Sequence, residues 1–104
     1  MARLRINPLV VEDLKEIKRY IGEDNPEAAA HTINSIYNRF EYICQFPLLG
    51  SELSRRVGFR TDLKYLIWEN YVILYRYHMS NSCIDIQRVV NRFQDITKIF
   101  DESE

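Results

Sequence analysis

The chain has 104 residues, of which 46% are hydrophobic and 28% are charged, and its formal net charge is −1. These proportions are ordinary for a soluble globular protein, so they exclude a disordered chain and a uniformly basic nucleic-acid binder. A chain of this length can form a core that needs neither a disulfide nor a metal ion. We therefore predict a single domain over residues 1–104, without a metal or a cofactor.

Membrane and secretory classes are also excluded. No apolar run approaches the ~18 residues that cross a bilayer, and the N-terminal stretch MARLRINPLV lacks a hydrophobic signal segment. We expect a cytoplasmic protein with no membrane contact. Cys44 and Cys83 lie far apart and lack metal-ligand spacing, which predicts two reduced, buried thiols.

The first half of the chain predicts one strand and two helices. Residues 2–7 alternate apolar and basic side chains, as in a strand with one buried face. Asn7 and Pro8 then match the cap and first residue of a helix that ends at Gly22. The same signal returns at Asn25 and Pro26, and the apolar stripe that follows predicts a helix up to 46–47. The two helices form an antiparallel hairpin whose apolar side must cover a sheet.

The second half predicts a meander of strands. Residues 48–58 show no period and are expected to form a loop. Strand patterns follow at 59–67, 71–78 and 83–90, and a short helix at 91–100 precedes an acidic tail, 101–104, that we expect to be frayed. The predicted fold class is α+β in the order β-α-α-β-β-β-α. It is an antiparallel sheet with an N-terminal edge strand, a two-helix hairpin on one face and a short C-terminal helix.

Alternation along the strands predicts which side chains face the helices. Tyr75 and its neighbours at every second position share a face with the apolar residues of strand 83–90, whereas Arg76 and His78 point to the other side. In strand 59–67 the apolar set is Phe59, Leu63, Tyr65 and Ile67. Bringing that set under the helices requires a three-residue loop at 68–70 or a bulge. Arg76 would then lie between Asp62 and Asp85 on a polar, helix-free face.

Several motifs resemble the RelE/ParE superfamily of bacterial toxin-antitoxin toxins. They are INPLVVEDLKEIKRYI, DNPEAA, FPLLGSEL, NYVILYRY and IDIQRVV, and together they span nearly the whole chain. The resemblance implies a small toxin that inhibits growth, that is neutralised by a cognate antitoxin and that belongs to a plasmid-stabilisation type of system. It leaves open a homodimer or a heterotetramer with the antitoxin.

The superfamily implies two alternative activities. ParE-like members bind and inhibit DNA gyrase, whereas RelE-like members are metal-independent endoribonucleases that cleave mRNA on the ribosome. A ribonuclease would depend here on basic residues and one histidine, namely Arg60, Lys64, Arg88, Arg92 and His78. Asn91 stands where many ribonucleolytic relatives carry a histidine, and an amide cannot exchange a proton near neutral pH. The ParE-like activity is therefore favoured. The alternatives are the ribonuclease and an inactive interaction module of the same fold.

Overall fold

Both long helices begin directly after the asparagines predicted to cap them. The structure is a computed structural model that describes residues 1–94 and 96–102. Helix α1 (Pro8–Gly22) is capped by the Asn7 side chain, which accepts a hydrogen bond from the Leu9 amide at 2.9 Å. Helix α2 (Pro26–Gln45) is capped in the same way by Asn25, which accepts from the Ala28 amide at 3.1 Å. Each cap satisfies an amide that the helix leaves without an internal partner.

Within the described residues, five strands form one sheet in the order β1-β5-β4-β3-β2. The strands are β1 (Arg3–Ile6), β2 (Ser51–Glu52), β3 (Lys64–Trp68), β4 (Tyr71–His78) and β5 (Cys83–Asn91), with a 3₁₀ turn, η1 (Met79–Asn81), between the last two. Strand β1 is the predicted N-terminal edge strand, and it runs parallel to β5. All the other pairs are antiparallel. The α+β fold class and the predicted order of the main elements are confirmed.

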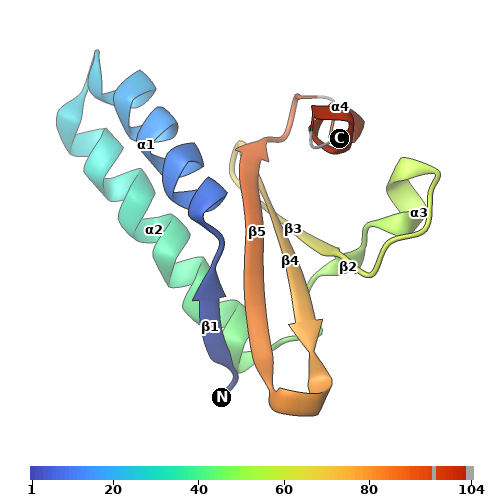
Figure 1. The fold of residues 1–104 in the computed structure, drawn as a ribbon. Coiled ribbons are helices and arrows are strands. Elements are labelled where there is room, and N and C mark those ends of the chain that lie inside the picture. The colour runs from blue at the N-terminus through green and yellow to red at the C-terminus, as the bar shows by residue number, and fades with distance from the viewer. Residues whose placement is uncertain (95, 103–104) are drawn as a thin grey trace.

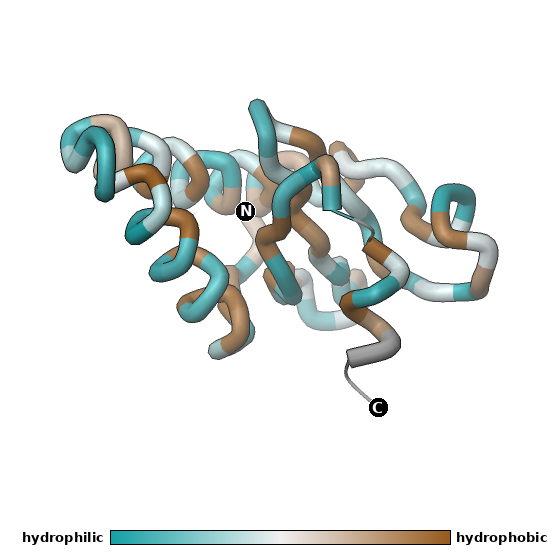
Figure 2. Tube along the Cα trace, turned by 90° about the horizontal axis from the view of Figure 1, so that it is seen from above, coloured by the Kyte–Doolittle hydropathy of each residue, from teal (hydrophilic) through white to brown (hydrophobic). Residues whose placement is uncertain are grey.

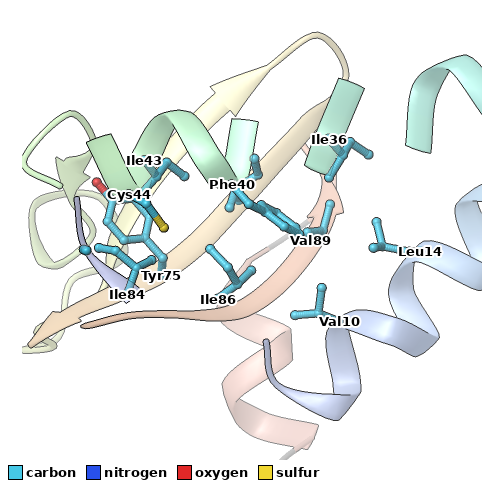
Figure 3. Packing of buried hydrophobic residues seen from close by; sticks show 12 residues of the cluster. Val10, Leu14, Ile36, Phe40, Ile43, Cys44, Tyr75, Ile84, Ile86 and Val89 are labelled. Atoms are coloured by element: carbon cyan, nitrogen blue, oxygen red, sulfur yellow. The ribbon is translucent and has the colours of Figure 1, made fainter. Parts of the chain in front are cut away.

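The α1–α2 hairpin covers one face of the sheet (Figure 1). Tyr75 and Ile86 are completely buried beneath it, together with Phe40 from α2 and Val10 from α1 (Figure 3). The predicted inward faces of β4 and β5 are therefore confirmed. Both cysteines are buried free thiols, as expected. No helix in the described ranges is long and apolar enough to cross a membrane.

The predicted faces of the strand before β4 are wrong. The turn between β3 and β4 has two residues, Glu69 and Asn70, because Trp68 already pairs with Tyr71. Relative to a three-residue loop, this shift by one position turns each side chain of β3 to the other face. Leu66 and Trp68 therefore pack under the helix hairpin, whereas Leu63, Tyr65 and Ile67 point away from it.

The second face of the sheet, which carries Val72, Leu74, Arg76 and His78, is only partly polar. The half of this face near the β3–β4 turn carries a second apolar cluster, so the prediction of a polar face without helices is wrong there. The buried members of the cluster are Leu53, Leu63, Val72, Leu74, Val90, Ile96 and Ile99. Two short helices, α3 (Ser54–Val57) and α4 (Thr97–Glu102), lie on this side (Figure 1). Figure 2 shows hydrophobic stretches in the strands between these segments and the helix hairpin.

Three predicted boundaries also differ from the structure. The expected loop 48–58 contains β2 and α3, which Leu53 anchors by its complete burial. Strand β3 starts at Lys64 rather than at residue 59. The last helix starts at Thr97 rather than at residue 91, and Phe93 is 79% exposed because it precedes the helix. Helix α4 extends through 101–102 of the predicted frayed tail, and residues 103–104 lie outside the described residues.

Candidate functional site

Asp85 is the centre of a polar cluster on the lower part of the second face. The Arg5 guanidinium donates two hydrogen bonds to it, from Nε to Oδ1 at 2.6 Å and from Nη2 to Oδ2 at 2.9 Å. The His78 Nε2 atom lies 2.6 Å from the same Oδ2. These contacts join β1, β4 and β5, because Arg5 and His78 occupy adjacent strands on either side of β5.

The electrostatics of this cluster favour an ionised carboxylate. The hydrogen bonds from Arg5 lower the pKa of Asp85 to about 2, and those with His78 act in the same direction, although burial opposes both. Asp85 therefore remains charged near neutral pH and cannot donate a proton there. Arg76 lies directly opposite Asp85, as predicted, and its Nε donates to the predicted partner Asp62 at 2.7 Å.

Arg88 is held by a carboxylate from α1. Its Nε and Nη2 atoms each donate to Asp13 at 2.9 Å, and the Val89 amide donates to the same carboxylate at 3.0 Å. Strand β1 ends at Ile6, so Asp13 accepts from the part of the β5 edge that has no strand beside it. Only 24% of the Arg88 side chain and 13% of the Asp13 side chain are exposed. The arginine thus contributes to attaching α1 to the sheet.

The remaining basic candidates are spread over the molecule. Arg92 follows β5, and its Nη1 donates to the Glu69 carbonyl at the β3–β4 turn at 3.3 Å. Lys64 begins β3 opposite Tyr75, and Arg60 is exposed in the segment before it. His78 ends β4, at the opposite end from the turn that Arg92 contacts. The seven-residue distance along β4 corresponds to about 23 Å, so the structure does not bring His78 and Arg92 together.

Two partners in these clusters were missed by the analysis of the sequence. The signal for His78 and Asp85 was present, because the predicted pairing of Arg76 with Asp85 puts His78 on the same face and two residues away along β4. The contact between Asp13 and Arg88 had no such signal. It joins residues 75 positions apart, and it depends on how α1 packs against β5.

A groove of about 810 Å³ lies between the far end of the helix hairpin and the β3–β4 turn. Its aromatic lining residues are Tyr20, Trp68, Tyr71 and Phe93, of which Tyr20 is 75% exposed and Phe93 is 79% exposed. Polar lining groups include Glu16, His31 and Asn91. Aromatic side chains with a few polar groups around a concave surface are suited to binding apolar side chains of a partner.

Comparisons with known proteins agree with the family resemblance found in the sequence. The sequence model of a family described as "ParE toxin of type II toxin-antitoxin system, parDE" matches residues 4–96. No curated protein sequence gives a significant match. Among solved structures, a chain of the chromosomal ParDE toxin-antitoxin system from P. aeruginosa has 19% identity and a TM-score of 0.70, covering 88% of this chain and 96% of that one.

A second solved structure is the toxin-antitoxin complex RelBE2 from Mycobacterium tuberculosis. The matched chain has 20% identity and a TM-score of 0.61, and the alignment covers 88% of this chain and 98% of that one. At such identities the two structures support the fold alone. The family match covers most of the chain, including both long helices, strands β2 to β5 and all of β1 except Arg3.

Proposed function

Because this chain belongs to the family of ParE toxins of type II toxin-antitoxin systems, we propose that it acts by binding and inhibiting a cellular target such as DNA gyrase. A cognate antitoxin neutralises it. A target and an antitoxin of these kinds imply that the protein acts in the cytoplasm, which is part of the proposal. The family match already gives the general function, a toxin of a type II toxin-antitoxin system. The proposal therefore concerns only how the toxin acts.

The dispersal of the basic residues is the observation that carries the proposal. Cleavage of RNA requires groups that act together on one phosphate, within hydrogen-bond reach of the reacting atoms. Here Arg88 is paired with Asp13, and His78 is in contact with Asp85 at the end of β4 that lies away from Arg92. Such an arrangement supports binding more than catalysis.

The groove supports the presence of a protein partner. Tyr20 and Phe93 expose most of their surface beside the half-buried Trp68 and Tyr71. Aromatic side chains of this kind contribute strongly to protein interfaces when they are covered. The two similar structures are both described as toxin-antitoxin systems or complexes, which supports an antitoxin as a partner. The assembly would be a heterotetramer with the antitoxin or a homodimer.

Two assays with the purified protein test the mode of action. We expect it to inhibit supercoiling by purified gyrase, and to leave mRNA on translating ribosomes uncut. Co-expression with the product of a neighbouring small gene should relieve growth arrest. Unchanged gyrase activity together with cuts at codon positions would overturn the proposal and favour the ribonuclease.

The ribonuclease alternative makes a separate prediction about the five basic residues. It would depend on Arg60, Lys64, Arg88, Arg92 and His78, so the double substitution Arg88→Ala and Arg92→Ala should abolish any cleavage. Harmless expression at a high level without the antitoxin would instead favour an inactive interaction module. Circular dichroism of the double variant must first show that it is folded, because Arg88 also contacts Asp13.

A further inference from the structure

A small cavity lies on the second face, between α3 and the start of α4. Its volume is about 190 Å³, and it is lined by Arg56, Val57, Arg92, Gln94, Ile96 and Thr97. A water molecule occupies roughly 30 Å³ in the liquid, so the cavity has room for a small polyatomic ion with some of its hydration. Two of the lining residues are arginines that come from separate parts of the chain.

The described side chains around this cavity do not balance its positive charge. Its described lining contains no carboxylate. Five other arginines form ion pairs, namely Arg5, Arg19, Arg55, Arg76 and Arg88. Among the described side chains, those of residues 1–94 and 96–100, no carboxylate pairs with Arg56 or Arg92. Two guanidinium groups beside one cavity create a positive potential that attracts an anion.

Each of the two guanidinium groups lies over an aromatic ring. The Cζ atom of Arg56 lies 5.3 Å from the centre of the Tyr65 ring, and that of Arg92 lies 5.6 Å from the centre of the Phe93 ring. Stacking uses the flat face of a guanidinium, so the N–H donors at its edge stay available for oxygen atoms. Arg92 uses one of these donors for the Glu69 carbonyl.

The backbone positions of both arginines are held by hydrogen bonds. The Arg56 amide donates to the carbonyl of Leu53 at 2.8 Å, and Leu53 is completely buried. The Arg92 amide donates to the carbonyl of Asn70 at 2.8 Å. A site whose groups are already positioned loses less conformational entropy when it binds a ligand.

We propose that Arg56 and Arg92 form a binding site for a phosphate group in this cavity. Guanidinium groups match the geometry of phosphate oxygens, because two parallel N–H donors can bind two oxygens of one group. The phosphate belongs either to a small phosphorylated molecule or to the backbone of a nucleic acid. The proposal concerns binding only, and it does not depend on the target of the toxin.

Inorganic phosphate is the probe for the first experiment. The full chain is titrated with phosphate at constant ionic strength, and the side-chain Nε–Hε signals of the arginines are followed by NMR. Signals of Arg56 and Arg92 should shift and saturate together. Constant ionic strength removes the general effect of screening on exposed charges. Absence of saturation at these two residues would overturn the proposal without affecting the gyrase assay.

Arg39 is a matched control. It also lies over an aromatic ring, with its Cζ atom 5.6 Å from the centre of Tyr42, but it does not line the cavity. We expect Arg56→Ala and Arg92→Ala each to weaken phosphate binding at least about tenfold, the effect of losing charged hydrogen bonds. Arg39→Ala should bind as the wild type does. If all three variants bound phosphate equally weakly, the loss of one positive charge would explain the effect, and the proposed site would be refuted.

A second titration separates the two sources of phosphate. A single-stranded RNA oligonucleotide of roughly ten nucleotides, a length within the range of single-strand binding sites, is added to the phosphate-saturated protein. Displacement of phosphate at Arg56 and Arg92 supports the site with a nucleic-acid backbone as its source. Unchanged signals support the site with a small phosphorylated molecule. The wild-type titration remains decisive even where a variant is unstable.

Discussion

The buried hydroxyl of Tyr75 attaches the loop after α2 to the sheet. Tyr75 has no exposed surface, its Oη atom accepts a hydrogen bond from the Gly50 amide at 2.8 Å, and it donates one to the Pro47 carbonyl at 2.9 Å. Gly50 has no space for a side chain, because an added Cβ would lie 2.7 Å from that Oη. The FPLLG motif is therefore explained by this contact. Tyr75→Phe removes both hydrogen bonds and preserves the ring.

The cost of this substitution can be worked out from the two bonds. Each buried hydrogen bond contributes about 1 kcal/mol, so the free energy of unfolding should fall by about 2 kcal/mol. For a domain of this size that corresponds to a decrease in Tm of roughly 8–16 °C. Tyr77→Phe is the control, since Tyr77 is half-buried on the same face and its hydroxyl has no hydrogen bond within the described residues. It should change stability by less than about 0.5 kcal/mol.

Urea unfolding followed by circular dichroism measures both variants. Their m-values should match that of the wild type, because the surface exposed on unfolding is the same. A Tyr75→Phe variant as stable as Tyr77→Phe would refute the attachment of the loop through the hydroxyl.

The dependence of stability on alkaline pH gives a second readout. Burial raises the pKa of Tyr75, so the unfolded chain releases this proton first, and wild-type stability should fall as pH rises above about 10. That contribution should be absent in the variant.

Three further predictions concern the sheet and its attachments. The pKa of Asp85 is lowered from 3.8 to about 2, so its contribution to stability should be complete above pH 4 and lost as pH falls toward 2, and a series of Tm values against pH should be flatter in Asp85→Asn. Asp13→Ala removes the acceptor of three hydrogen bonds and should lower the free energy of unfolding by about 2–4 kcal/mol in the same urea assay. Glu12→Ala, at the exposed neighbouring residue, is the control and should change the free energy of unfolding by less than about 0.5 kcal/mol. Gly50→Ala should lower Tm through overpacking that costs about 1–3 kcal/mol, whereas Gly22→Ala, where the nearest atom to the added Cβ is 3.7 Å away, should leave it unchanged or raise it.

Local signals in the sequence determined the helices and the inner faces of two strands. Asn7 and Asn25 cap helices through hydrogen bonds that span two or three residues, so neighbouring residues suffice to predict them. Alternation along 71–78 and 83–86 separates polar from apolar positions at the lower end of the sheet. Only one register there buries the apolar residues under the hairpin, and the structure has that register.

The faces of β3 were decided by the tertiary structure. The stretch from Tyr65 to Trp68 is apolar on both sides, because the hairpin covers one face and the segment with α3 and α4 covers the other. Alternation therefore carries no information there about which side faces which core. The length of the turn decides it, and that turn places Glu69 at a φ of 54°, a conformation that glutamate rarely adopts.

Whether a feature could be predicted from the sequence depends on whether its contacts are local or distant. The sequence by itself determined the element order, the capped hairpin and the buried side of β4 and β5, because each follows from the pattern of nearby residues. Only the tertiary structure brought Asp13 to Arg88 and placed Arg56 beside the same cavity as Arg92. These residues are 75 and 36 positions apart, and nothing in their local pattern specifies that α1 packs on β5 or that α3 approaches α4.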